Sequence, residues 1–356
     1  MTEKELLQHR MNNLDINAPR FNKPEQLVAW LGGIQAQDFG QGKWAIGSRI
    51  PGSTNESIDK AIASQTIVRT WMMRGTIHVV SPDDVQWLTD LLATRIIARN
   101  KTRYEHLELS EKTLGKANEI LRKALESGDT VTRTGISEIL KDKKIIATGV
   151  RLAHILQFAC LKNTICFSAK QGKDFGFTRL KPTKKSSFSR EQALTELASR
   201  YFSSHGPASV KDFIWWSGLA PEEARKGLES IKSKLEKFDI NGDTYFADKD
   251  IGANPKPDHR AHLLAGFDEY IVGYTNRSAG IHQDIINHVI RSNGIFYPTI
   301  ILDGFVKGIW KPLVKKDSLN IEIQRFSAFS KSMEKELKLA AKRYSDFVGK
   351  KLGEII

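Results

Sequence analysis

Two glutamines separated by one residue, Gln35-Ala36-Gln37, form the group in this sequence with the clearest chemical potential. A carboxamide oxygen accepts a hydrogen bond from water while its nitrogen donates elsewhere, so two amides held together could fix one water beside a reacting atom. Positioning of this kind lowers a barrier by about 7–11 kcal/mol in ideal intramolecular reactions. In the alternative interpretation, one glutamine caps a helix end and the other faces solvent.

The local backbone decides between these interpretations. Residues two apart lie about 200° apart around a helix, but on the same side of an extended segment. The helix predicted to start at Pro24 must therefore end before Gln35, and Gly32-Gly33 weakens it there. Residues 38–42, Asp-Phe-Gly-Gln-Gly, are also rich in helix breakers. Asp38 could orient the pair or stabilise a cation, or it could be a local hydrogen-bonding group at a helix end.

A predicted hairpin over residues 67–80 carries three further candidates, Arg69, Arg74 and His78. If strand alternation holds, Arg74 and His78 share one face, where the arginine could contact phosphate and the histidine a substrate. A half-buried histidine bonded to backbone is an equal alternative for His78.

Asp268 and Glu269 are adjacent carboxylates of the kind used in acid–base or metal chemistry. In a strand they would point to opposite faces, so we favour a structural role in which they bond arginine or backbone groups. A supporting contribution to a site is the second interpretation.

Basic residues near the C-terminus and in the middle of the chain could contact nucleic acid. Lys307 and Lys311 flank a predicted hairpin over residues 305–310, which could enter a minor groove or be a plain β-hairpin. The densest basic stretch could contact phosphate or be a solvated loop, and it contains Lys170, Lys173, Arg179, Lys181, Lys184 and Lys185.

Composition favours a polyanionic partner and a reducing compartment. The 356-residue chain has 54 basic and 41 acidic residues, a net charge of +13 and a pI near 9.5. Charge alone does not separate nucleic acid from an acidic membrane or from a generally basic protein. The two cysteines lack zinc-site spacing, the N-terminus lacks an export signal, and no apolar run approaches about 20 residues. We expect a cytoplasmic protein without metal or cofactor.

The elements that must position these residues follow one pattern three times, with helices followed by a turn-centred pair of strands. Predicted helices cover residues 57–63, 132–140, 149–161, 191–203, 210–216 and 221–231, and predicted strands cover 67–73, 76–80, 164–168, 175–178, 234–240 and 244–247. Strands at 262–264, 295–302, 305–310 and 319–325 and a helix at 331–350 then predict a small β-domain. Three helices and a hairpin, as at residues 191–247, describe a winged helix.

Five segments, in order, resemble the winged-helix DNA-binding family that includes the AlkZ-type glycosylases. They are LGGIQAQD (31–38), TWMMRGTIHVVSPDD (70–84), GPASVKDFIWWSGL (206–219), AGFDEYIVGYTNR (265–277) and GIFYPTIILDGFVKGIW (294–310). The resemblance implies an α+β, C-shaped body of three tandem winged-helix units, at 1–108, 109–188 and 189–253, with a β-domain at 254–356 and DNA on the concave face. Where relatives often have proline before the fourth segment, this chain has Leu264-Ala265-Gly266.

The same resemblance implies a function. It suggests a monomeric, monofunctional DNA glycosylase that hydrolyses the N-glycosidic bond of bulky or crosslinked N7-alkylpurines in double-stranded DNA. Gln35 and Gln37 would match the family's glutamine–apolar–glutamine triplet and position the water, with Asp38, His78, Asp268 and Glu269 as supporting candidates. Arg69, Arg74, Lys173, Arg179, Lys307 and Lys311 would contact DNA. The alternatives are a non-catalytic regulator or damage sensor, and a drug-sequestering protein.

Overall fold

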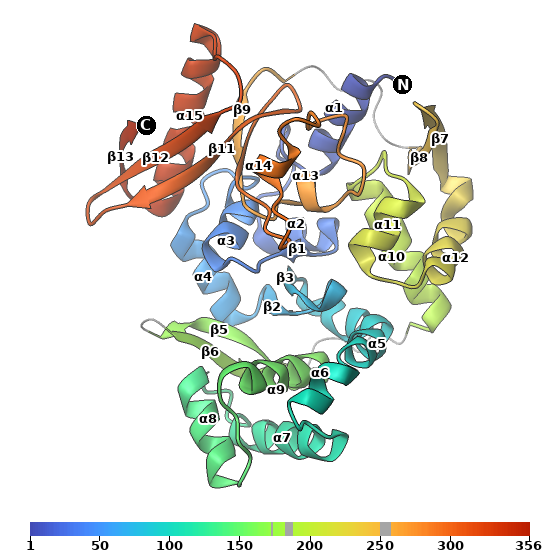
Figure 1. Ribbon diagram of the computed structural model, residues 1–356, viewed down its shortest axis with the longest axis vertical. Helices are drawn as coiled ribbons and strands as arrows, with labels where there is room; N and C mark the ends of the chain where they lie inside the picture. Colours follow the sequence, from blue (N-terminus) through green and yellow to red (C-terminus); the bar gives the residue numbers. More distant parts are fainter. Residues whose placement is uncertain (172–173, 182–187, 250–257) are drawn as a thin grey trace. The chain divides into compact units, whose positions relative to one another are not determined.

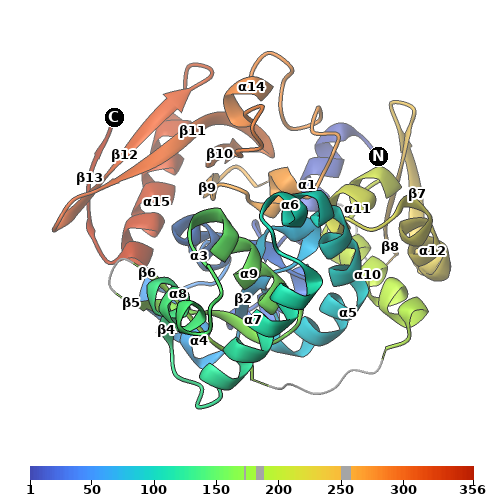
Figure 2. The same ribbon diagram turned by 60° about the horizontal axis from the view of Figure 1, so that its bottom comes forward.

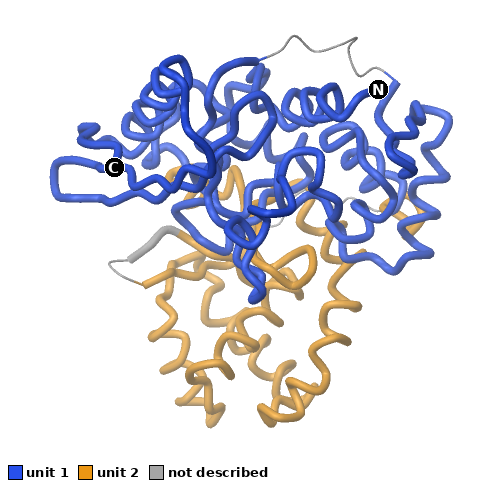
Figure 3. Tube along the Cα trace, turned by 45° about the horizontal axis from the view of Figure 1, so that its top comes forward, with its two compact units in different colours: residues 1–58, 194–356 blue, residues 59–193 orange. Residues whose placement is uncertain are grey.

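The computed structural model describes residues 1–171, 174–181, 188–249 and 258–356. The chain forms two compact units: unit 1 comprises residues 1–58 and 194–356, and unit 2 comprises residues 59–193 (Figure 3). Both units contain helices and strands, so the fold is α+β as predicted. The predicted domain boundaries and the division into winged-helix units stay predictions.

The N-terminal part of unit 1 consists of short helices around one short strand. Its elements are α1 (Glu3–Asn13), α2 (Pro24–Leu31), β1 (Ile34–Gln35), α3 (Phe39–Gly47) and α4 (Asn55–Ser64), the last of which continues into unit 2. Pro24 opens α2 because its fixed φ suits a first helical turn, and Gly32 ends it with φ 71°. The predicted end of this helix before Gln35 is confirmed.

Next in unit 1 come helices and a hairpin. They are α10 (Arg190–Ser204), which begins in unit 2, α11 (Val210–Ser217), α12 (Pro221–Ile231), a 3-10 turn (Lys232–Lys234), β7 (Leu235–Ile240) and β8 (Asp243–Asp248). Ser209 and Asp212 form a capping box on α11. Asn241 and Gly242 make the predicted tight turn, both with positive φ. The predicted order of three helices and a hairpin is confirmed here.

The C-terminal part of unit 1 is a sheet curled around one helix (Figures 1 and 2). Its strand order is β13-β12-β11-β10-β9, and α15 packs against both edge strands, β9 and β13. A helix that touches both edges of a sheet requires the sheet to curl, which gives a half-barrel. The elements are β9 (Ala261–Leu264), α13 (Glu269–Val272), α14 (Ile286–Val289), β10 (Thr299–Leu302), β11 (Phe305–Val314), β12 (Ser318–Arg325), α15 (Lys331–Val348) and β13 (Lys351–Ile355).

Aromatic side chains fill the interior of this half-barrel. The Trp44 ring of α3 packs edge-on against Tyr344 of α15 at 4.9 Å, and Trp310 of β11 meets the same tyrosine at 4.8 Å. Both indoles also donate to neighbouring carbonyls of β9, Trp44 to Leu263 and Trp310 to Leu264. Because buried Trp N–H groups need an acceptor, the Trp44 bond fixes α3 against the sheet, and the Trp310 bond links β11 to β9 within it.

Unit 2 has helices packed on its own sheet, whose strands follow the order β3-β2-β5-β6-β4. Helix α9 packs against β2 and β5, over a core that includes Leu121, Ile155, Phe167 and Phe177. The elements are β2 (Val68–Trp71), a 3-10 turn (Met73–Gly75), β3 (Ile77–Val80), α5 (Pro82–Arg99), α6 (Lys101–His106), α7 (Glu111–Ala124), β4 (Val131–Thr132), α8 (Arg133–Asp142), α9 (Gly149–Leu161), β5 (Ile165–Gln171) and β6 (Asp174–Arg179).

Three local features differ from what the sequence suggested. Residues 39–47 form helix α3 despite two internal glycines, and residues 269–272 form helix α13 rather than the strand that was considered for Asp268 and Glu269. Arg74 lies in the turn after β2 with φ 59°, so strand alternation does not reach it and it shares no strand face with His78. Within the described residues, no helix combines the length and the apolarity needed to cross a membrane.

Candidate active site

The segment that carries the two glutamines leaves α2 through a glycine turn. Gly32 and Gly33 have φ 71° and 150°, and β1 follows immediately. The indole of Trp216 lies against this turn, because a Cβ on Gly32 would stand 3.2 Å from its ring. Glycine is therefore needed both for the backbone conformation and for the close approach.

The two glutamine side chains differ in exposure. Gln35 is 5% exposed, whereas Gln37 is exposed, and Ala36 between them is buried. The Gln35 side chain is thus largely enclosed by the protein, and Gln37 is accessible to a substrate.

A buried carboxylate holds the backbone of Gln35. The Gln35 N–H donates to Glu269 Oε1 at 3.0 Å, and the Trp216 indole donates to Oε2 at 2.9 Å. His205 Nε2 lies 3.4 Å from the same Oε2, and Glu269 itself is 1% exposed. Burial lowers the pKa of His205 below its ordinary value of 6.5, so the imidazole is neutral at pH 7. Hydrogen bonds satisfy the carboxylate on both oxygens, which fixes the start of the glutamine segment.

Asp268, the neighbouring carboxylate, binds a different partner. Its two oxygens accept from Arg49 Nη1 and Nη2 at 2.9 and 2.8 Å, and Arg49 Nε donates to the Leu14 carbonyl at 2.7 Å. Both charged side chains are buried. Asp268 also caps α13 by accepting from the Tyr270 N–H. The structural role favoured for these two carboxylates therefore agrees with their contacts, and Asp268 links α13 to the chain just after α3.

Helix α3 supports the glutamine segment from the other side. Asp38 caps the helix by accepting from the Gln41 N–H at 3.0 Å, so the local hydrogen-bonding interpretation of Asp38 is confirmed. The Gln41 amide oxygen accepts from the Gly266 N–H at 2.9 Å. A Cβ on Gly42 would stand 2.6 Å from Ala36 Cβ and 2.9 Å from Ala36 Cα. Glycine at position 42 lets the helix press against the residue between the two glutamines.

The predicted residues of the first hairpin lie in unit 2. His78 is fully buried on β3, and its Nδ1 is 3.2 Å from the Thr76 carbonyl. Arg69 is 1% exposed, and its guanidinium lies over the rings of Phe167 and Phe175 at 4.2 and 4.6 Å. This burial speaks against phosphate contact by Arg69. Arg74 is half-buried in its turn.

The other predicted DNA contacts are spread over the chain. Arg179 on β6 is half-buried and pairs with Glu126 at 3.7 Å, whereas Lys173 lies outside the described residues. On β11, Lys307 is half-buried and Lys311 is exposed, 4.0 Å from Glu322. DNA contact by these residues stays a prediction.

The turn between β10 and β11 does not protrude. A Cβ on Gly304 would stand 2.8 Å from Leu7 Cβ, and the Gly304 carbonyl accepts from the Tyr270 hydroxyl. Trp310 is 2% exposed. The turn therefore packs on α1 and α13, and the structure favours the plain-hairpin interpretation for the segment from 303 to 310.

Sequence reasoning missed the residues that support the glutamine segment: Gln41, Gly42, Arg49, His205 and Trp216. Only the tryptophan carries a signal in the sequence, because Trp215 and Trp216 are adjacent at the end of the helix predicted at 210–216, where one of two large apolar rings is expected to pack inside. Trp216 is fully buried and Trp215 is 41% exposed.

Metal-ligating and thiol side chains were the other groups considered for chemistry. Across residues 1–171, 174–181, 188–249 and 258–356, no cluster of three or more His, Cys, Asp or Glu side chains is placed to hold a metal ion. Cys160 and Cys166 are buried, and burial raises the pKa of the Cys160 thiol to about 12. A thiol in that state is a poor nucleophile.

Comparison with known proteins identifies the family of this chain. The sequence matches the model of the AlkZ-like DNA glycosylase family over residues 28–347. A curated relative, the interstrand DNA cross-link repair glycosylase of Streptomyces sahachiroi, is 24% identical over 310 residues, which cover 80% of this chain and 81% of the relative. The solved structure of Streptomyces sahachiroi DNA glycosylase AlkZ matches with a TM-score of 0.81 at 20% identity, with both chains fully covered. The chain belongs to the family of AlkZ-like DNA glycosylases.

Proposed function

We propose that this protein is a monofunctional DNA glycosylase that releases N7-alkylated purines, including bulky or crosslinked ones, from double-stranded DNA. Family membership supports the reaction, and the printed name of the Streptomyces relative supports the crosslinked substrate. The observation that carries the proposal is the buried Glu269 bonded to the Gln35 backbone, because it holds a two-amide segment in a fixed place.

In the proposed reaction, Gln35 and Gln37 hold a water beneath C1′ of the damaged nucleotide. An N7-alkylpurine carries positive charge and is a good leaving group, so little acid catalysis is needed. The amide oxygens orient the water as the sugar gains oxocarbenium character. Neutral amides stabilise that cation less than a carboxylate would. Unmodified nucleosides are therefore poor substrates.

The proposed DNA partner fits the charge and the element order of the chain. A net charge of +13 favours a polyanion. Helices α10, α11 and α12 followed by the β7–β8 hairpin support a winged helix in unit 1, a module that lays a helix in a DNA groove. We propose that a single chain binds damaged duplex DNA as a monomer.

Product analysis tests the proposed function. Wild-type protein is incubated with duplexes that contain 7-methylguanine or an N7-linked interstrand crosslink, and free base and abasic sites are measured by mass spectrometry. We expect free base, an intact abasic strand and no protein–DNA adduct after borohydride reduction, since no lysine nucleophile takes part. If the protein binds the damaged duplexes but releases no base, it is a damage sensor and not a glycosylase.

A further inference from the structure

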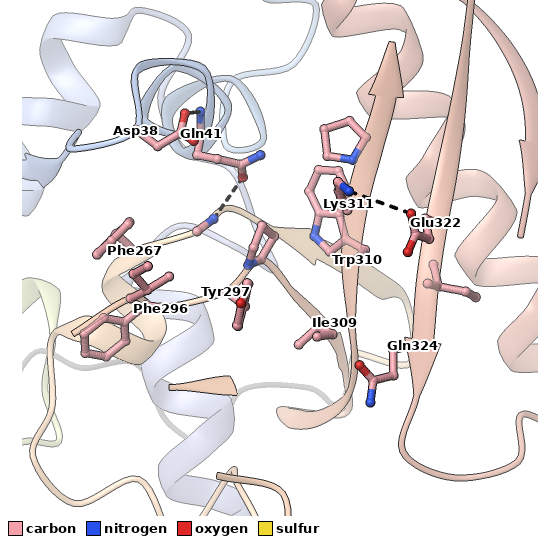
Figure 4. A pocket seen from close by; sticks show the side chains of 15 residues that line it. Asp38, Gln41, Phe267, Phe296, Tyr297, Ile309, Trp310, Lys311, Glu322 and Gln324 are labelled. Atoms are coloured by element: carbon pink, nitrogen blue, oxygen red, sulfur yellow. Dashed lines mark hydrogen bonds and ion pairs between the residues drawn. The ribbon is translucent and has the colours of Figure 1, made fainter. Parts of the chain in front are cut away.

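A cavity of about 420 Å³ lies in unit 1, at the N-terminal end of α3 (Figure 4). Asp38, which caps α3, and Gln41 within α3 form one side of it, and Phe267 and Phe296 lie side by side on another. Strands β11 and β12 close it with Ile309, Lys311, Glu322 and Gln324 among other residues. Asp38 follows Gln37 directly in the chain, so the cavity begins one residue from the proposed water-positioning pair.

The walls of this cavity suit a flat ring. The Phe267 and Phe296 rings are 5.8 Å apart and tilted by 48°, while Ile295 at the same cavity is 40% exposed. The polar groups come from the side chains of Asp38, Lys311, Glu322 and Gln324, and Lys311 already pairs with Glu322. A purine or another planar aromatic group has apolar faces, which stack on aromatic side chains. The volume is in the range of small-molecule sites, about 300–1,000 Å³.

Phe267 adds a second, independent observation. Its backbone has φ 60°, in the left-handed region that a bulky residue rarely adopts. Two hydrogen bonds fix this backbone conformation. The Gly266 N–H donates to the Gln41 amide oxygen, and the Phe267 N–H donates to the Phe296 carbonyl at 3.3 Å. The Phe267 ring is nevertheless only half-buried. A strained aromatic residue that is kept partly exposed beside a cavity is typical of a binding site rather than a core position.

We propose that this cavity binds the planar aromatic group of the lesion while the glutamine pair acts at the sugar. The inference rests on the proposed function and adds a specificity site to it. The same chemistry has two possible sources, the alkylated purine itself or a flat aromatic substituent attached to it. Either would stack on Phe267 and Phe296.

The test uses two variants from opposite walls. Phe267→Gly removes the ring at a position whose positive φ suits glycine, so the backbone keeps its path. Ile309→Trp on β11 fills the cavity from the other side. Phe329→Ala is the matched control, because Phe329 is a half-buried phenylalanine of unit 1 that does not line the cavity.

Single-turnover base release is measured at increasing protein concentration on two duplexes, one with 7-methylguanine and one with an N7-guanine adduct that carries a flat aromatic substituent. Both cavity variants are expected to raise the half-saturating concentration or lower the maximal rate by about tenfold, the size of one stacking contact. If the variants release base less efficiently from both duplexes, the cavity binds the purine. If they do so only from the adduct duplex, the cavity binds the aromatic substituent. Wild-type behaviour of both variants on both duplexes would overturn the inference.

A binding measurement distinguishes failure of the proposed glycosylase function from failure of the cavity inference. If the wild type releases no base, its affinity for each lesion duplex is compared with that for undamaged duplex by fluorescence anisotropy. A preference for a lesion that both cavity variants lose, and Phe329→Ala keeps, supports the site without catalysis. No preference in the wild type, or the same preference in the cavity variants, overturns the inference.

Discussion

Glu269 accepts a hydrogen bond from the backbone N–H of Gln35 at 3.0 Å, across 234 residues of sequence. Its other oxygen accepts from Trp216, so Glu269→Gln places an amide nitrogen opposite at least one buried donor. We expect base release to fall roughly 10- to 100-fold through misplacement of the glutamine segment. DNA affinity, measured by anisotropy, stays within about twofold of wild type.

The control for that variant is Glu354→Gln, which makes the same change at an exposed position on β13. It should leave base release and thermal stability unchanged. Equal base release by Glu269→Gln and wild type would mean that Glu269 serves folding alone.

Gly42→Ala tests whether close packing under Ala36 positions the glutamines. The new Cβ would stand 2.6–2.9 Å from Ala36 atoms, so the segment must shift. We expect a loss of stability of about 1–3 kcal/mol from overpacking, with a fall in the base-release rate beyond what the folded fraction explains. Gly115→Ala in α7 is the control, because a Cβ there meets nothing within 4 Å. Normal release by fully folded Gly42→Ala protein would refute the positioning role.

The buried Arg49–Asp268 pair predicts a large stability effect. Arg49→Met leaves an unpaired carboxylate in the interior of unit 1, which costs about 3–5 kcal/mol of unfolding free energy. Urea denaturation measures this loss. Arg122→Ala, which breaks the exposed Arg122–Glu119 pair, should leave the unfolding free energy close to that of the wild type, because solvent screens exposed ion pairs. Similar costs for the two variants would contradict the assigned burial.

Buried histidines predict acid sensitivity. Burial lowers the pKa of His205 and of His262 below the ordinary value of 6.5. In the unfolded chain these histidines take up protons at a higher pH than in the folded chain. The free energy of unfolding therefore falls as the pH drops through about 6.5 toward the lowered pKa values of the folded chain. The thermal unfolding midpoint of the wild type should fall between pH 7.5 and pH 5. The midpoint of His262→Gln should fall less steeply over the same range. If the midpoint of His262→Gln falls with pH as steeply as that of the wild type, the burial of His262 does not cause the acid sensitivity.

Local sequence signals were enough for much of the fold. Pro24 and Gly32 predicted the bounds of α2, and Asn241-Gly242 predicted the β7–β8 turn, because each depends on the conformational preference of one or two residues. Helix α3 was missed because Gly40 and Gly42 read as helix breakers. Its stability comes instead from tertiary contacts, such as that of Trp44 with Tyr344.

For the candidate site, the sequence singled out the two glutamines and the adjacent carboxylates Asp268 and Glu269, but not the partners that these residues bind. The partners that fix them are distant in the chain, as with Gln41 and Gly266 or Arg49 and Asp268. A single sequence carries no signal for such pairs, since the geometry that joins them exists only after folding. Asp268 and Glu269 were weighed as strand residues, but Asp268 caps helix α13 and pairs with Arg49.

Single-turnover release of 7-methylguanine by Gln35→Ala and Gln37→Ala tests the central claim most directly. Gln283→Ala serves as the matched control, an exposed glutamine of unit 1 outside this segment. The account predicts a loss of about 100-fold or more in each of the first two variants, with DNA affinity retained and the control at the wild-type rate. Wild-type rates in both Gln35→Ala and Gln37→Ala would contradict water positioning by the two amides.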